Sequence, residues 1–206
     1  MYGADTSYFK DDRIGLFLKS LRINAPLNPT IATVITVPML ERILISCLQL
    51  SNPKVYRALY LFMFYSFLRL SNVLPHSARL FDVSRHLTRG DLIFSESLCT
   101  IVVKWSKTLQ NRKEIQTISI PVLNNSPLCP VAALKAMFQA YPASRNDPLF
   151  PAAADRCHVA LADSAARKHL KAVSLAMNIV PHLTFHDFRR SGTTFAFLAG
   201  AWDLVL

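Results

Sequence analysis

The chain has 206 residues, of which 51% are apolar, so it is long enough for one domain of ordinary size with a short extension. Its 23 Lys and Arg against 13 Asp and Glu give a formal charge of +10 at pH 7. This composition excludes disorder as the overall state and favours a polyanionic partner, either a nucleic acid or an anionic membrane surface.

The apolar run at residues 58–68 is the only segment that we weigh as a membrane segment. It is too short to cross a bilayer and lies between Arg57 and Arg69, so it predicts a helix buried in a protein core. The first 13 residues carry charges where a signal peptide has its apolar stretch, which predicts an intracellular protein. We therefore expect a nucleic-acid partner and no membrane.

The four cysteines are widely spaced and form no CxxC or CxxH pair, so we expect free thiols in a reducing compartment. Cys157 and His158 are adjacent and could supply two metal ligands, but no second half of such a site is visible. The sequence predicts no metal site and no cofactor.

The N-terminal part of the chain divides at its prolines. Residues 1–25 include a short amphipathic piece at residues 14–21 and are expected to end an earlier domain, and residues 26–38 are expected to be a linker. A helix is expected after Thr36, with Pro38 in its first turn, running to Leu50. Asn52 and Pro53 then mark the start of the apolar helix, which delivers Arg69 at its end.

Three short β-branched segments predict a small antiparallel sheet: residues 92–94, 101–105 and 115–120. The basic loop 106–113 places Lys107 just past the end of a strand. Further helices are expected from Pro130 toward Tyr141, from a cap at Asp163 to Met177, and from a cap at Thr184 onward. The expected fold class is α+β, mainly helical, with the sheet at one edge.

The last helix carries the strongest local motif, Thr184-Phe-His-Asp-Phe-Arg-Arg-Ser-Gly192. Thr184 and Asp187 have the spacing of a capping box, so His186 and Arg189 would lie one turn apart beside the positive end of the helix dipole. That arrangement suits an anion. An apolar face on the same helix is expected to anchor it to the core; its members are Phe185, Phe188, Phe195 and Leu198.

Each of these cations also has a structural interpretation when taken alone. His186 and Arg189 could be solvated residues on a helix surface, and Lys107 could be an ordinary hairpin lysine. Arg69 could face the dipole at a helix C-terminus, although a cation beside a fully apolar helix is costly without an anion. The order in which they occur along the chain is more specific than any one of them.

In that order, FYSFLRLSNVLP around Arg69, VVKWSKTLQNRKEIQTISIP around Lys107, and HDFRRSGTTFAF with His186 and Arg189 resemble the tyrosine recombinase, or phage-integrase, family. The wording of the last motif is more similar to recombinases of eukaryotic mobile elements. The resemblance covers residues 30–206. It implies that residues 1–25 end the helical DNA-clamping domain and that residues 39–206 form a catalytic domain that is incomplete at its C-terminal end.

The resemblance implies a role for each residue. Arg69 and Arg189 would clamp the non-bridging oxygens of the scissile phosphate, because guanidinium forks fit that geometry and stay charged. Lys107 would protonate the departing 5′ oxygen, with Lys104 the weaker candidate, and His186 would assist in positioning and proton transfer. The family needs no metal. Further expected DNA contacts are Arg190, Lys104, Arg112 and Lys113.

Two departures from the family pattern accompany the resemblance. Asn72 stands where the family usually has a carboxylate, so a hydrogen bond can be kept while a charge is lost. The family's nucleophilic Tyr lies beyond the point where this sequence ends, and Trp202 falls too early for the residue that precedes it. We therefore expect no covalent 3′-phosphotyrosyl intermediate from this chain alone, and some apolar surface left uncovered.

Three functions of different classes are consistent with these residues. The chain is a site-specific DNA strand-exchange enzyme of the tyrosine type, inactive as it stands; or a DNA-binding remnant that keeps the phosphate clamp without cutting; or a basic domain that binds another polyanion, such as RNA, and matches by chance. We expect the first. The partners would be double-stranded DNA and further copies of the chain on it, and the location intracellular and DNA-associated, nuclear in a eukaryote.

Overall fold

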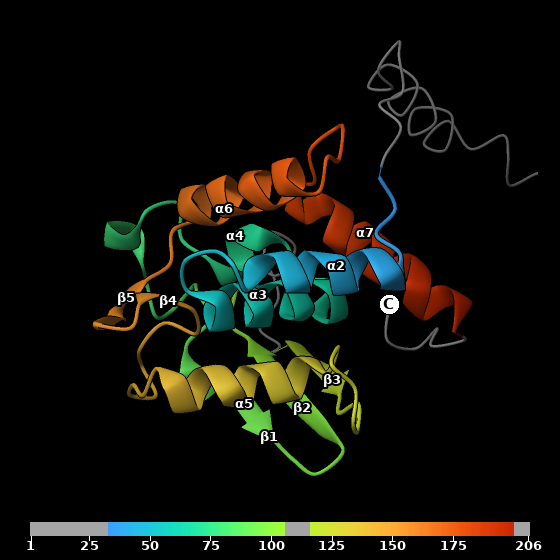
Figure 1. Ribbon diagram of the computed structural model, residues 1–206. Coiled ribbons are helices and arrows are strands. Elements are labelled where there is room, and N and C mark those ends of the chain that lie inside the picture. The colour runs from blue at the N-terminus through green and yellow to red at the C-terminus, as the bar shows by residue number, and fades with distance from the viewer. Residues whose placement is uncertain (1–32, 106–115, 200–206) are drawn as a thin grey trace, which may run out of the picture. The chain divides into compact units, whose positions relative to one another are not determined.

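The computed structural model of the chain describes residues 33–105 and 116–199, which belong to one compact unit, Thr33–Leu206 (Figure 1). A second unit, Met1–Ala32, comprises residues outside the described ranges. The expected amphipathic piece at residues 14–21 and most of the expected linker therefore lie outside the described residues.

The described part begins with two helices whose starts agree with the sequence prediction. Helix α2 (Val37–Cys47) is capped by Thr36, whose hydroxyl accepts a hydrogen bond from the Met39 amide at 3.4 Å, and it ends before the expected Leu50. Helix α3 (Pro53–Ser66) starts at its proline. It is buried on nearly all sides, which confirms that the apolar run is a core helix. Among the described residues, no helix is long and apolar enough to cross a membrane.

Helix α3 is the centre of the hydrophobic core. Tyr60, Phe62 and Phe64 on it are almost completely buried. Helices α5 (Pro130–Ala140) and α7 (Phe185–Leu198) pack directly against α3, while α6 (Asp163–Ala176) packs against α2. In Figure 1, α5 and the three-stranded sheet lie on one side of α3, and α6 and the start of α7 lie on the other.

The predicted antiparallel sheet is present, in the order β1 (Leu92–Phe94), β2 (Leu98–Val103) and β3 (Gln116–Pro121). Strand β2 begins before its expected start because the Ser95 amide and hydroxyl both bond to the Leu98 carbonyl, which closes a tight hairpin. The expected start of the third strand, Ile115, lies outside the described residues.

The C-terminal half contains the expected helices and one sheet that the sequence did not predict. Strands β4 (Pro151–Ala153) and β5 (Arg156–Ala160) form a two-stranded antiparallel sheet. Asp163 is the first residue of α6, and Ala162 occupies the cap position. The expectation that Asp163 caps α6 was therefore wrong. Its carboxylate instead lies 3.5 Å from His76 and 3.6 Å from Arg167.

The expected apolar face of α7 is buried only at its N-terminal end. Phe185 and Phe188 are buried in the core, whereas Phe195 is 46% exposed and Leu198 is 78% exposed. The C-terminal half of α7 extends beyond the ends of α2 and α3 (Figure 1), and there only one side of it meets the core, where the Phe195 ring lies 6.1 Å from that of Phe64. The anchoring function predicted for all four residues thus holds for two of them.

Candidate active site

Arg69 lies in a tight turn between α3 and the short helix α4 (Leu70–Val73). Helix α3 ends at Ser66, and Phe67 has a φ of 55°, which ends the helix in the left-handed region. Arg69 itself is extended and occupies the cap position of α4 with its side chain exposed. The expectation that the apolar helix carries Arg69 at its end was therefore wrong, because the helix ends at Ser66, before Arg69.

Helix α7 starts with the predicted capping box. The Asp187 carboxylate accepts hydrogen bonds from the Thr184 amide at 2.8 Å and hydroxyl at 2.7 Å, and the Thr184 hydroxyl accepts from the Asp187 amide at 3.4 Å. Because Asp187 is committed to this cap, its charge is turned toward the helix start. His186 is exposed and Arg189 is half-buried one turn later.

Gly192 brings α7 into backbone contact with α3. A Cβ at this position would lie 1.9 Å from the Phe64 carbonyl oxygen and 3.1 Å from the Phe67 ring, so no side chain fits. The neighbouring Ser191 hydroxyl accepts a 2.7 Å hydrogen bond from the Ile35 amide. The helix turn that carries Arg189 is thus fixed beside the chain turn that carries Arg69. Neither the Ser191 hydrogen bond nor the Gly192 contact was predicted, although both residues belong to the motif that carries His186 and Arg189.

The structure places Arg69 near enough to Arg189 for its charge to act on that guanidinium. Burial lowers the pKa of Arg189, and the positive charge of Arg69 lowers it further. None of the ion pairs among the described residues involves either arginine. Two neighbouring cations with no carboxylate partner favour an anion chemically, and the planar fork of a guanidinium group suits a phosphate.

Asn72 links this turn to the sheet. It is buried at 5% exposure, and its Nδ2 donates a 3.2 Å hydrogen bond to the Trp105 carbonyl at the end of the chain segment that leaves β2. Trp105 directly precedes residues 106–115, which contain three of the expected site residues. Those residues lie outside the described ranges: Lys107, Arg112 and Lys113.

The two remaining expected DNA contacts differ in their surroundings. Lys104 lies at the surface, where its ammonium is 2.8 Å from the Asp91 carboxylate and donates to the Val83 carbonyl at 2.9 Å. Its charge is therefore compensated. Arg190 is exposed on α7, next to Arg189.

A pocket of about 670 Å³ lies beside the α4 turn and was not predicted from the sequence. Ser71 of α4 and Trp105 line it, and the Arg85 guanidinium lies 5.9 Å from the centre of the Trp105 indole ring. His86 also lines it, and burial lowers the pKa of that imidazole. The lining also contains two carboxylates, Asp82, which lies 3.6 Å from Arg85, and Asp163, so the charge in this pocket is mixed.

The tyrosines within the described residues belong to the core. Tyr56, Tyr60 and Tyr141 are buried, and Tyr65 is half-buried. Burial raises the pKa of each phenol. The Tyr60 hydroxyl lies 2.8 Å from His169 Nδ1. None of these four phenols is placed to act as an exposed nucleophile.

The architecture matches several solved recombinases. The XerA recombinase superposes with a TM-score of 0.56 at 18% identity over 97% of this chain and 63% of that chain. The fold resembles that of the tyrosine recombinase catalytic domain. The XerH site-specific recombinase bound to its difH substrate gives 0.54 at 15% identity over 91% of this chain and 52% of the other.

The FLP recombinase in a Holliday junction complex shows the same recombinase fold, with a TM-score of 0.52 at 15% identity over 99% of this chain and 50% of that chain. This chain thus spans about half to under two thirds of the length of the recombinases that it matches. No protein-family model matches the sequence, and a search of curated proteins found no match. The likeness is one of fold, and it agrees with the family that the motifs resemble.

Proposed function

We propose that this chain binds the backbone of double-stranded DNA and acts in DNA strand exchange of the tyrosine recombinase type. In this proposal Arg69 and Arg189 both bind the same phosphate. The observation that carries the proposal is the pairing of two guanidinium groups without a carboxylate partner. A pentacovalent phosphorus in the transition state carries more negative charge than the phosphodiester. Fixed cations therefore stabilise it more than the ground state.

The other site residues have roles in the same proposal. His186, exposed at the start of α7, would bond a phosphate oxygen and assist proton transfer, and Lys107 would protonate the leaving 5′ oxygen. Arg190, Arg112 and Lys113 would bind neighbouring phosphates. Lys104 is already paired with Asp91, so in this proposal it would stabilise the sheet rather than bind DNA. Strand cleavage also needs a tyrosine nucleophile, which we assign to no described residue.

The partners in this proposal are double-stranded DNA and further copies of the chain assembled on it. Three lines of support are the basic charge of +10, the recombinase fold, and the DNA complexes named for the similar structures, a difH substrate and a Holliday junction. We further propose an intracellular, DNA-associated location.

The test is the affinity for duplex DNA, measured by fluorescence anisotropy over a range of salt concentrations. Arg69→Ala and Arg189→Ala should each weaken binding about tenfold and reduce the salt slope by about 1, because each removes one charge-assisted phosphate contact. The matched control is Arg156→Ala, an exposed arginine on β5 that lies 3.7 Å from Asp155. An equal loss in the control would mean that only general charge matters. Tighter binding of duplex RNA than of duplex DNA by the wild-type protein would indicate that its partner is another polyanion.

A second candidate function is DNA binding without cleavage, and the core positions of the described tyrosines favour it. The chain would be incubated with supercoiled plasmid and then denatured with detergent. Absence of both plasmid relaxation and a covalent protein–DNA adduct would support this candidate. An adduct would contradict it, and mapping the adduct would identify the nucleophile.

A further inference from the structure

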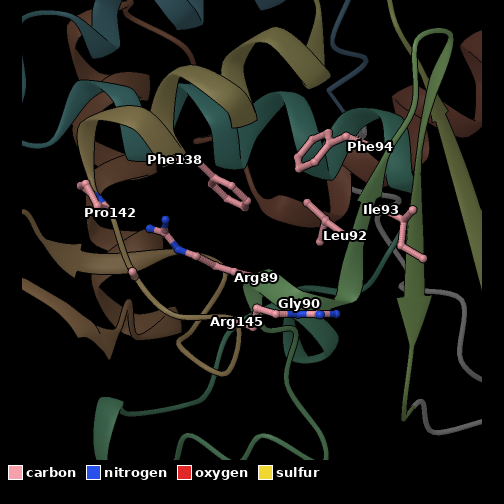
Figure 2. A pocket seen from close by; sticks show the side chains of 9 residues that line it. Arg89, Gly90, Leu92, Ile93, Phe94, Phe138, Pro142 and Arg145 are labelled. Atoms are coloured by element: carbon pink, nitrogen blue, oxygen red, sulfur yellow. The ribbon is translucent and has the colours of Figure 1, made fainter.

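A second pocket, of about 630 Å³, lies between the start of β1 and the C-terminal end of α5 (Figure 2). Its volume falls in the range of small-molecule sites, and its walls are mostly apolar. The rings of Phe94 and Phe138 line it, 5.7 Å apart and edge to face. None of its lining residues belongs to the candidate active site.

The polar wall of this pocket is built by pairing two distant segments. The Arg89 amide donates to the Asp147 carbonyl at 3.0 Å, and the Gly90 amide donates to the Arg145 carbonyl at 2.8 Å. A Cβ on Gly90 would lie 3.0 Å from that carbonyl oxygen and 3.3 Å from the Arg145 Cβ, so the close approach depends on glycine. This pairing holds the Arg89 backbone rigidly at the pocket.

The Arg89 side chain is buried without hydrogen-bond partners for two of its three nitrogens. It is 7% exposed, and within the described residues neither Nε nor Nη2 has a partner. Its guanidinium carbon lies 4.5 Å from the centre of the Phe138 ring. Asp147, which contributes an opposing charge, has its carboxylate bonded to the Ser144 amide at 2.7 Å. A buried cation with unpaired donors is costly, so an acceptor at this place would be strongly favoured.

The remaining lining defines the rest of the ligand. In Figure 2 the Arg89 guanidinium lies between Pro142 and Phe138, while Arg145 extends in the opposite direction past Gly90. Arg145 is therefore directed away from the Arg89 guanidinium, and the side chains beside Arg89 are mostly apolar. A carboxylate fits the side of a guanidinium with two parallel hydrogen bonds, from Nε and one Nη.

We propose that this pocket binds a small carboxylate that carries an apolar group. The carboxylate bonds to Nε and Nη2 of Arg89, and the apolar group packs against Phe94 and Phe138. Because both nitrogens are covered in the structure, binding requires the guanidinium to turn outward from the Phe138 ring. Such a turn involves the terminal torsions of one side chain and leaves the backbone in place.

The experiment titrates the folded chain with phenylacetate and with its neutral isostere phenylacetamide, followed by calorimetry and by NMR of the aromatic resonances. We expect saturable binding of phenylacetate with a dissociation constant of about 1 mM, as ligands of this size allow. Phenylacetamide should bind at least about tenfold more weakly, because it lacks the charge. Equal binding of the two, binding of inorganic phosphate in competition with phenylacetate, or no saturable binding would overturn the proposal.

Variants separate this site from a purely structural arginine. Arg89→Met should abolish phenylacetate binding while leaving the melting temperature unchanged or raised, since it removes a buried unpaired cation. Ala143→Phe narrows the pocket without altering Arg89 and should also abolish binding. Arg145→Met is the control and should bind normally. Normal binding by Ala143→Phe, or a large fall in melting temperature of Arg89→Met with binding retained, would contradict the proposal.

Discussion

Arg69 and Arg189, the proposed phosphate-binding pair, place two positive charges near each other in the folded chain. The positive charge of Arg69 lowers the pKa of Arg189, which is also half-buried. Their repulsion is present in the folded chain and absent from the unfolded chain. In the proposed function, a phosphate that bridges the two arginines would remove that cost.

Arg189→Met should therefore stabilise the free chain slightly while weakening DNA binding. We expect the free energy of unfolding in urea to rise by about 0.5 kcal/mol, a small value because solvent screens a partly exposed charge. Arg190→Met, on the same helix and exposed, is the matched control and should leave stability unchanged. A clear loss of stability in Arg189→Met would show that the guanidinium makes a structural contact.

The contribution of the hydrogen bond between Asn72 and Trp105 can be tested by replacing the side-chain amide with a carboxylate. Its Nδ2 donates to the Trp105 carbonyl, which a carboxylate cannot do. Asn72→Asp should lower the free energy of unfolding by about 1–3 kcal/mol above pH 6, because a buried acceptor then faces another acceptor. The neighbouring Ser71→Ala, at an exposed position, is the control for urea unfolding. Wild-type stability in Asn72→Asp would mean that the bond to Trp105 contributes nothing.

At the scale of the helix, the contact between α7 and α3 depends on a missing side chain. Replacing an exposed helical glycine with alanine normally stabilises a helix by about 1 kcal/mol. Gly192→Ala should instead destabilise the domain by about 3 kcal/mol or more, because the new Cβ would lie 1.9 Å from the Phe64 carbonyl oxygen.

The same substitution should move Arg189 away from Arg69 and weaken DNA binding even in molecules that remain folded. Thr194→Ala, exposed on the same helix, serves as the control for both thermal unfolding and DNA affinity. If Gly192→Ala folds and binds DNA as well as the wild type does, the two helices are not held in backbone contact at this position.

Signals carried by a few adjacent residues allowed the helix starts to be predicted. The cap at Thr36, the proline at residue 53 and the capping box at Thr184 each depend on residues within one turn, and each was confirmed. The end of α3 was not predicted, because Phe67 takes its left-handed conformation where α7 presses against it through Gly192. That contact joins residues far apart in the sequence.

In the sheets, too, features that depend on neighbouring residues were predicted, and features that depend on distant residues were missed. Strand β1 was predicted with its observed limits, whereas β4 and β5 were missed. Their residues, Pro-Ala-Ala and Arg-Cys-His-Val-Ala, contain few of the branched or aromatic side chains that mark a strand. The pairing of Lys104 with Asp91 was not predicted, because the two residues are separated in the sequence by strands β1 and β2. The pairing of Arg69 with Arg189 was implied by the family resemblance, and periodicity alone would not have predicted it.

At the scale of the whole molecule, the core contains a titratable group that links stability to pH. His169 is 7% exposed, stacks on Tyr56 with ring centres 3.4 Å apart, and has no partner at Nε2 among the described residues. Burial lowers the pKa of this imidazole to about 4. In the unfolded chain the same group binds a proton near its ordinary pKa of about 6.5.

Stability should therefore fall as the pH falls from about 6.5 to about 4, because in that window the unfolded chain binds a proton that the folded chain does not. The loss should reach about 3 kcal/mol and level off below about pH 4. Urea unfolding at several pH values, compared between wild type and His169→Gln, measures the difference. Parallel pH curves for the two proteins would show that His169 remains protonated in the core.

Because of the backbone contact at Gly192, only some substitutions are expected to alter the proposed phosphate site. The separation of Arg69 and Arg189 is set where two main chains touch, at Phe64 and Gly192, and both chains continue directly into the core. Exchanging exposed side chains would leave that spacing alone. Enlarging or shrinking a side chain under α3 would change that spacing. The packing of the core therefore determines which anion fits between the two arginines.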